Sequence, residues 1–334
     1  MRAAGIALAL ALLPAAAGGA GEPSSEGSEP APPLPWREPV PPARMFLQLP
    51  FEAPGVVEGR AFRAELRLSY ANSILVASTP SLALDVDLES AELQALFRYG
   101  LARGLEVQLA VPAMVDTGGF LDGPIEAVEG AFGATSMPGR RGRAHGLARF
   151  RLLRPDGTGV WRDGAAAGLG DVWAGLKARL LDETGGWPEM ALRAVIKAPT
   201  GRPPYGSGEV DAGASLSAGW TWSRIGFRFQ LDAIAPTAGL RAARVSTHVY
   251  GAGQAGVAVA VSGAVTLHAQ WATHLSPYAA IGLPPLDATT HYAIAGASVA
   301  LSRSLALEAA AAENVLSPAW GADFTLLLGL RARR

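Results

Sequence analysis

Between residues 91 and 112, apolar and polar residues alternate on both sides of a short break bounded by glycines. Leu93, Phe97 and Tyr99 alternate with charged or amide residues before the break at 100–104, and the alternation resumes after it. A period of two places successive side chains on opposite faces of a strand, so the pattern predicts a β-hairpin with one apolar and one polar face. The same unit recurs towards the end of the chain. This repetition predicts a membrane β-barrel, whose apolar faces contact lipid and whose polar faces line a lumen.

The composition narrows the classes of function. Charged residues are only 17% of the 334, and the net charge of −1 provides no basic surface, so no nucleic-acid partner is expected. Cysteine is absent, which excludes disulfides, thiolate metal sites and a cysteine nucleophile. The five histidines are scattered without the spacing of metal ligands, so neither a metal nor another cofactor is expected.

The first 45 residues predict two segments that precede the barrel. Arg2, an apolar run over 3–13 and small residues up to Gly21 have the form of a secretory signal peptide, which we assign to residues 1–20. Residues 21–45 are rich in proline, glutamate and serine, a composition that predicts an extended or disordered linker. The barrel domain is then expected over residues 46–334.

About twelve strands can be counted from Phe62 to the end of the chain. An even number is usual in bacterial barrels, and short connections alternate with long ones, as periplasmic turns alternate with external loops. Residues 308–313 have helical propensity, but the alternation around them favours a strand. The sequence therefore predicts an all-β fold: an antiparallel transmembrane β-barrel of about twelve strands with a short helix in one long external loop.

Aromatic residues flank several of the short turns. Tyr99, Trp187, Trp220 and Trp222 lie there, on one side of the predicted barrel. Membrane barrels carry girdles of aromatic residues at the interfaces between lipid and water. These four side chains are therefore expected at the periplasmic interface.

The polar faces of the predicted strands carry charges of both signs, which should point into the lumen. The candidate lumen-lining residues are Arg63, Glu65, Arg67, Asp85, Asp87, Lys177, Arg179, Arg193, Lys197, Asp211, Arg228 and Asp232. Two roles are open for them. They either close a narrow barrel through networks of salt bridges or line a path for a solute.

The longest predicted loop, residues 116–168, contains a candidate plug. Ile125, Val128 and Phe132 share one face of a predicted helix within residues 120–133. An apolar stripe needs a surface to bury against, and a barrel of about twelve strands is narrow enough to be occluded by one inserted element. We expect this helix to fold over or into the external mouth. A helix on the surface of the loop is the alternative.

Three functions are compatible with these patterns. The first is a narrow or plugged channel or transporter for small, including hydrophobic, solutes, or a structural membrane component. The second is a barrel-type lipid-modifying enzyme, for which the only local pair is His274 and Ser276, although the register points His274 into the barrel rather than towards lipid. The third is a soluble exported β-protein that binds a ligand. It would bury Leu192, Leu216 and Phe227, which a membrane barrel exposes.

Several glycine-containing motifs carry a resemblance to a known family. They are Arg98-Tyr99-Gly100 onward to Pro112, Gly118-Gly119-Phe120-Leu121-Asp122-Gly123 onward to Gly133, Gly168-Leu169-Gly170-Asp171, Lys197-Ala198-Pro199-Thr200-Gly201 and Gly206-Ser207-Gly208-Glu209-Val210-Asp211. With these motifs the chain resembles an uncharacterised family of Gram-negative outer-membrane proteins, domain of unknown function 3187. The matching stretches span most of the mature chain.

This resemblance implies a barrel in the outer membrane and no established activity or catalytic residues. It also implies two partners, the lipid of the outer membrane and the barrel assembly machinery. The chain departs from the usual pattern at its end. It finishes Leu330-Arg331-Ala332-Arg333-Arg334, where such barrels usually carry a terminal aromatic residue. The sequence gives no indication of the oligomeric state.

Overall fold

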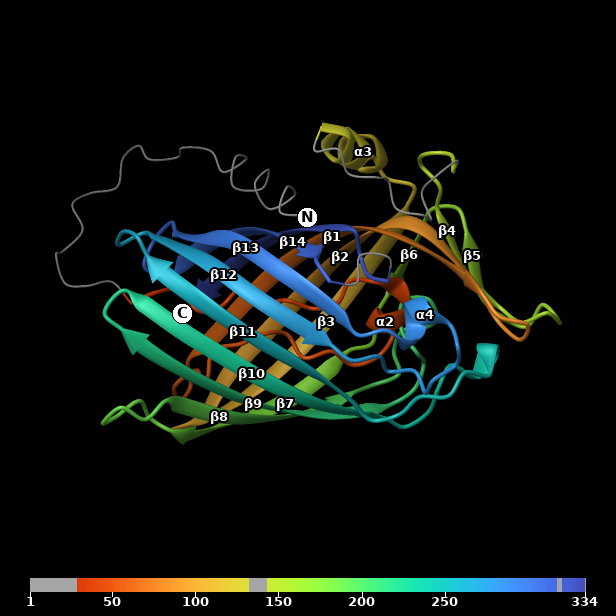
Figure 1. The fold of residues 1–334 in the computed structure, drawn as a ribbon. Coiled ribbons are helices and arrows are strands. Elements are labelled where there is room, and N and C mark those ends of the chain that lie inside the picture. The colour runs from red at the N-terminus through yellow and green to blue at the C-terminus, as the bar shows by residue number, and fades with distance from the viewer. Residues whose placement is uncertain (1–28, 132–142, 317–319, 334) are drawn as a thin grey trace.

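The computed structural model describes residues 29–131, 143–316 and 320–333. Within these residues twelve antiparallel strands form a closed barrel, because the first strand pairs with the last (Figure 1). The barrel strands are β1 (Phe62–Ser78), β2 (Ala83–Ala102), β3 (Leu105–Thr117), β7 (Trp173–Leu181), β8 (Glu189–Lys197), β9 (Asp211–Trp222), β10 (Ile225–Pro236), β11 (Tyr250–Ala260), β12 (Val265–His274), β13 (Thr290–Ala300), β14 (Leu305–Asn314) and β15 (Phe324–Arg333). The prediction of an all-β barrel of about twelve strands is confirmed, including the strand over residues 308–313.

The longest loop, between β3 and β7, contains regular structure of its own. A hairpin of β4 (Arg149–Leu153) and β5 (Gly159–Asp163) pairs with the first residues of β2, and β6 (Ala166–Leu169) pairs with the end of β3. The helices are short: α2 (Pro41–Arg44), α3 (Asp122–Ala131), α4 (Pro284–Asp287) and the 3-10 helix η1 (Arg241–Ala243). No helix in the three described ranges is long and apolar enough to cross a membrane.

The outer face of the barrel is apolar, as the alternation predicts. Along β10, apolar side chains are exposed, whereas the intervening arginine, glutamine and aspartate are buried. Leu192, Leu216 and Phe227 keep 45%, 38% and 36% of their surface exposed. A soluble protein would bury these side chains, and a membrane barrel presents them to lipid. The structure therefore excludes the soluble alternative.

The two ends of the barrel differ in the length of their connections. We call the end with short connections the turn end and the opposite end the loop end. Tyr99, Trp187, Trp220 and Trp222 are exposed beside connections of the turn end, where the aromatic girdle was predicted. The long loop between β3 and β7 and the loops that contain η1 and α4 lie at the loop end.

Two of the predicted lumen-lining residues face outward instead. Strands β1 and β2 pair in one continuous register without a bulge, so the parity of β2 is fixed along its whole length. Since Leu93 and Phe97 face lipid, Asp85 and Asp87 lie on that same outer face. The prediction was wrong for both aspartates. Their partners are outside the lumen as well, because Arg143 contacts both carboxylates and Arg149 lies 3.1 Å from Asp85.

The error arose because the pattern of β2 inverts where the strand leaves the bilayer. Beyond that point the outer face meets water and polar loop residues. The inner face instead packs into an apolar core, in which Leu84 and Val86 are buried with Phe150 and Leu152 of β4. The alternation of apolar and polar residues continues where β2 leaves the bilayer, but beyond that point the polar residues lie on the outer face instead of the inner one.

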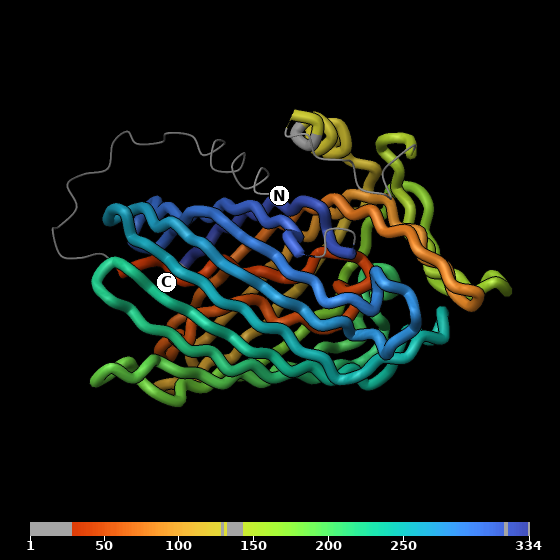
Figure 2. Tube along the Cα trace, in the orientation of Figure 1, coloured from red at the N-terminus to blue at the C-terminus, as the bar shows by residue number. Residues whose placement is uncertain are grey.

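The Pro-rich segment before β1 lies inside the barrel. Residues 29–60, which we call the luminal segment, run through the lumen (Figure 2, red to orange). Leu34, Trp36, Phe46 and Phe51 are each buried to 2% exposure or less. The composition predicted an extended or disordered linker over residues 21–45, of which 21–28 lie outside the described residues. The described part is extended but forms the core of the barrel. Proline suits this place because it lacks an N–H group, and each one leaves one donor fewer to satisfy in a buried extended chain.

Helix α3 does not fill the lumen. Figure 1 shows it standing off the outside of the barrel wall. Ile125 is half-buried there, and the side chain of Val128 and the whole of Phe132 lie outside the described residues. The structure thus differs from the expected inserted helix, and a different part of the chain fills the lumen. The reason is physical: the luminal segment already occupies the space that the helix would need.

Candidate functional site: the occluded lumen

The luminal segment makes a U-turn inside the barrel. At the turn end the backbone N–H of Ala31 donates to Oγ1 of Thr266, at 3.1 Å. Near the loop end the hydroxyl of Tyr278 donates to the carbonyl of Pro42, at 2.7 Å, where α2 reverses the chain. The returning half reaches the turn end again, where the N–H of Val57 donates to Glu106, at 2.6 Å. Both ends of the segment therefore lie at the turn end.

At the U-turn, a buried ion pair ties the segment to the wall. Arg44 donates from Nη2 to both carboxylate oxygens of Asp116, at 2.8 and 2.7 Å, and from Nη1 to Ser90, at 2.7 Å. The guanidinium carbon lies 5.7 Å from the ring centre of Tyr205. Both charged side chains are almost fully buried. A buried ion pair of this geometry is costly to break from one side, because it leaves the other charge unpaired.

A lysine of β8 holds the backbone just after the U-turn. Nζ of Lys197 lies 2.5 Å from Asp171, 3.1 Å from Asp211 and 2.7 Å from Ser207, and it donates to the carbonyl of Met45, at 3.2 Å. Asp211 in turn accepts from the N–H of Leu47, at 2.8 Å. Three of the glycine-containing motifs of the sequence, at 168–171, 197–201 and 206–211, meet in this cluster. Their shared role in the structure is to position the luminal segment.

Glu52 of the returning half binds three cations of the wall. Its carboxylate lies 2.9 Å from Arg98, 2.8 Å from Arg193 and 3.4 Å from Lys177. Lys177 also donates to the carbonyls of Ala53 and Gly55, at 2.6 and 2.9 Å. The cluster joins strands β2, β7 and β8 to one residue of the segment.

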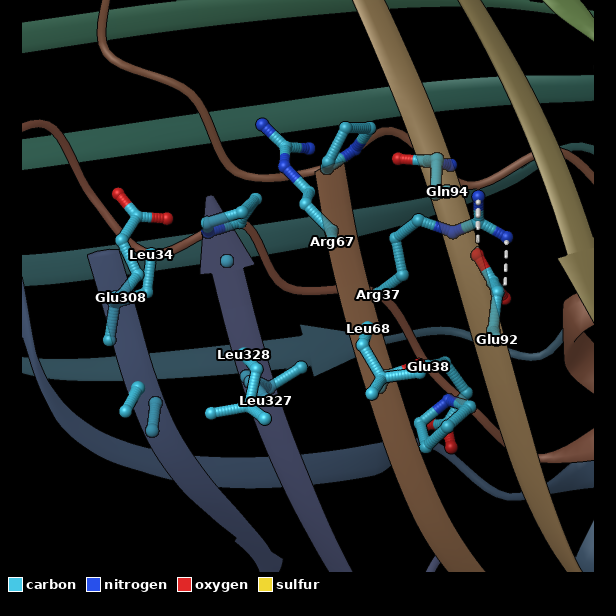
Figure 3. A pocket seen from close by; sticks show the side chains of 17 residues that line it. Leu34, Arg37, Glu38, Arg67, Leu68, Glu92, Gln94, Glu308, Leu327 and Leu328 are labelled. Atoms are coloured by element: carbon cyan, nitrogen blue, oxygen red, sulfur yellow. Dashed lines mark hydrogen bonds and ion pairs between the residues drawn. The ribbon is translucent and has the colours of Figure 1, made fainter. Parts of the chain in front are cut away.

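The outgoing half makes a fourth set of polar contacts. Arg37 pairs with Glu92 of β2, at 3.3 Å, and Figure 3 shows this pair next to Gln94, with Arg67 between the pair and Glu308. The cavity at this place has a volume of about 40 Å³, enough for one water molecule.

The next residue of this half, Glu38, accepts hydrogen bonds from Thr290 and Tyr292 of β13, at 2.6 and 2.5 Å. A second small cavity, at the loop end beside Tyr278, also has a volume of about 40 Å³. At both places the segment and the wall leave too little room for a solute larger than water.

The predicted lumen-lining residues fall into four groups in the structure. Lys177, Arg193, Lys197 and Asp211 contact the luminal segment directly, and Arg179 pairs with Glu58 of the same segment at 2.9 Å. Glu65, Arg67, Arg228 and Asp232 lie on the inner face and contact other wall residues. Arg63 is on the inner face at the turn end, and Asp85 and Asp87 are outside.

Sequence reasoning missed the residues on the other side of these contacts, Arg37, Glu38, Arg44 and Glu52. Arg37, Glu38 and Arg44 belong to residues 21–45, which composition assigned to a linker, and Glu52 lies between that stretch and the first predicted strand. A signal was available in the sequence: Leu34 and Trp36 interrupt the Pro-rich tract, and an apolar run follows at 45–51. Large apolar side chains of this kind are rare in linkers that remain solvated.

The geometry does not support the lipid-modifying alternative. The hydroxyl of Ser276 donates to the carbonyl of Leu286, and Nε2 of His274 is buried with no hydrogen-bond partner among the described residues. The two side chains therefore do not form the hydrogen-bonded pair that would activate a serine.

The sequence matches, over residues 28–333, the family model described as a protein of unknown function, DUF3187. Comparison with curated proteins found no match.

Among solved structures, the COG4313 outer-membrane channel from Pseudomonas putida F1 is similar with a TM-score of 0.55 and 12% identity. The alignment covers 84% of this chain and 97% of that one. A FadL homologue of Pseudomonas aeruginosa gives a TM-score of 0.38 with 10% identity over 82% of this chain and 90% of that one. The CymD monoaromatic hydrocarbon channel gives 0.37 with 10% identity over 83% and 89%.

At 12% identity, the similarity to the COG4313 channel shows the fold alone. A closed antiparallel barrel with an apolar outer face and this similarity is an outer-membrane barrel, and its outer face contacts the lipid of that membrane.

Proposed function

The chain belongs to the DUF3187 family, and we propose that it is a gated outer-membrane channel for small solutes, closed in this structure by its luminal segment. In this proposal the turn end faces the periplasm and the loop end faces the exterior, as in barrels with short periplasmic turns. The barrel assembly machinery inserts the chain into the membrane.

The observation that carries the proposal is the polar attachment of the segment to the wall. A segment that served only as a core could be wholly apolar. This one instead carries Arg37, Arg44 and Glu52 in ion pairs with the wall. Once the segment undocks, its charged side chains are hydrated, and the charged wall that it leaves behind is wetted. A plug that moves needs both the charged side chains and the wettable wall, whereas a segment that never leaves the lumen needs neither.

The path of the segment sets the direction of opening. Because its two ends lie at the turn end, it can withdraw as a loop through that end without threading a free terminus past the barrel. The contacts at Arg44 and Lys197 lie farthest from the turn end and must break for the lumen to open. Opening therefore proceeds towards the periplasm.

The proposal is tested by conductance in planar lipid bilayers. We compare the full chain with a variant that lacks residues 33–54, after checking that both migrate as heat-modifiable barrels on a gel. The full chain should show rare, brief openings, and the deletion should show a stable, larger conductance. A deletion variant that folds and does not conduct would show that the lumen is no path for solutes, and would leave a structural membrane component.

A further inference from the structure

A cavity at the turn end of the lumen is large enough for a ligand. Its volume is about 410 Å³, roughly that of a dozen water molecules. Residues 29–32 of the luminal segment form one wall. Residues of β1, β12, β13, β14 and β15 form the other, together with the turns at 262–264 and 302–304. The two cavities deeper in the lumen have volumes of about 40 Å³ each, so this space is a vestibule below the closed part.

The charged residues that line the vestibule are mostly cationic. They are Arg63, Arg303 and Arg331 against one carboxylate, Glu29, which is exposed. Arg331 pairs with Glu308. Arg63 has no ion pair with any residue in the described ranges, and its Nε is buried without a hydrogen-bond partner.

The surroundings of Arg63 explain why no carboxylate is available to it. In the register of the sheet, Arg63 lies directly opposite Arg98 on β2 and opposite the backbone position of Arg333 on β15. Like charges in directly opposed positions destabilise a sheet. The nearby ion pairs already join five cations to four carboxylates: Arg67, Arg98, Lys177, Arg193 and Arg331 to Glu52, Glu65, Glu106 and Glu308. Arg63 adds a sixth positive charge.

Hydroxyl groups complete the wall beside these arginines. Oγ1 of Thr266 accepts from the N–H of Ala31, so its own proton is available to a ligand. Oγ of Ser298 is 2.8 Å from Nε2 of His268 and also faces the vestibule. An arginine fork with adjacent hydroxyl groups is the arrangement that binds the planar or tetrahedral oxygens of a carboxylate or phosphate.

We propose that the vestibule binds a small oxyanion, a carboxylate or a phosphate group, with Arg63 as its principal ligand and Thr266 as a second donor. The site is complete in the closed structure. Binding does not depend on displacement of the luminal segment, so the proposal stands apart from the gated-channel function. The same chemistry is offered by a free solute in the periplasm and by the headgroup of a phospholipid.

Calorimetric titration of the purified full chain in a neutral detergent tests the proposal. The probes are inorganic phosphate, acetate and a soluble short-chain phosphatidylglycerol, each at low salt. Arg63→Gln should weaken the binding of the anion that binds best by at least about tenfold, because a charge-assisted fork is lost. Arg63→Lys should retain part of the affinity, and added sodium chloride should lower it.

Arg224→Gln is the matched control, since Arg224 is exposed on another turn of the same end. It should bind as the unsubstituted chain does. Heat-modifiable migration on a gel reports whether each variant folds. Tighter binding of free phosphate or acetate identifies a solute site, and tighter binding of the short-chain lipid identifies a headgroup site. The proposal fails if none of the three probes binds, or if Arg63→Gln binds as tightly as the Arg224→Gln control.

Discussion

The ion pair between Arg44 and Asp116 should decide how often the luminal segment leaves the wall. Asp116→Asn removes the negative charge and leaves the buried guanidinium without its counterion, although one side-chain oxygen still accepts a hydrogen bond. Breaking a buried pair from one side costs about 3–5 kcal/mol. Because the amide keeps one contact, we take the lower end, which raises the undocked population roughly 100-fold.

The absence of cysteine from the chain provides the assay. Leu49→Cys places a single thiol on the buried segment, and a membrane-impermeant maleimide labels it only when the segment opens. When closing is fast relative to labelling, the labelling rate is proportional to the open population. We expect Asp116→Asn to raise that rate roughly 100-fold in the Leu49→Cys background.

Asp163→Asn is the matched control. Its carboxylate also pairs with an arginine, Arg151, but the two side chains are 40% and 41% exposed on the β4–β5 hairpin. Exposed pairs contribute little to stability, so labelling should change little. If Asp116→Asn raises the rate no more than Asp163→Asn does, the buried pair does not hold the segment and our reasoning about the lumen is wrong.

Three further outcomes follow from the structure. Lys197→Met should leave Asp171 and Asp211 as buried carboxylates without their cation and should therefore raise the frequency of channel openings in bilayers. Adding Asp171→Asn and Asp211→Asn to this variant should restore near-closed behaviour. An unchanged opening frequency in Lys197→Met would contradict the role of this cluster. Deleting residues 123–131 of α3 should leave conductance unchanged, because the helix stands outside the wall, and a raised conductance would show that it acts at the mouth. Leu216→Arg on the lipid face should destabilise the barrel by about 2–4 kcal/mol in urea unfolding, whereas Ala165→Arg, at an exposed position outside the strands, should change stability little; equal effects would argue against a lipid-facing Leu216.

The barrel could be predicted from the sequence because lipid and lumen impose opposite demands on alternate residues. This alternation of apolar and polar residues can be read within each strand, even in the alanine-rich β14. The incorrect predictions occur where the surroundings of the two faces change. Asp85 and Asp87 keep the alternation of a lumen-lining strand, but their part of β2 has left the bilayer, so the polar face is the outer one.

The luminal segment could not be predicted by the same reasoning. Composition rules for disorder ask whether a segment can bury enough apolar surface to fold by itself in water, and by these rules residues 29–45 remain unfolded there. Inside the barrel their partners are residues such as Lys197 and Asp116, which are distant in sequence and carry no local mark of the pairing. The motif residues Asp171 and Asp211 were visible in the sequence, but their role needs the segment beside them.

The position of the luminal segment also imposes an order of events on biogenesis. The segment precedes every strand in the chain, yet its partners lie far along the sequence: Leu34 bonds with Gln270, and Glu38 bonds with Thr290. These partners take their places only when the last strands arrive and β15 closes on β1. The luminal segment is therefore synthesised before the strands but reaches its final place only after them, and it can enter the closed barrel as a loop through the turn end.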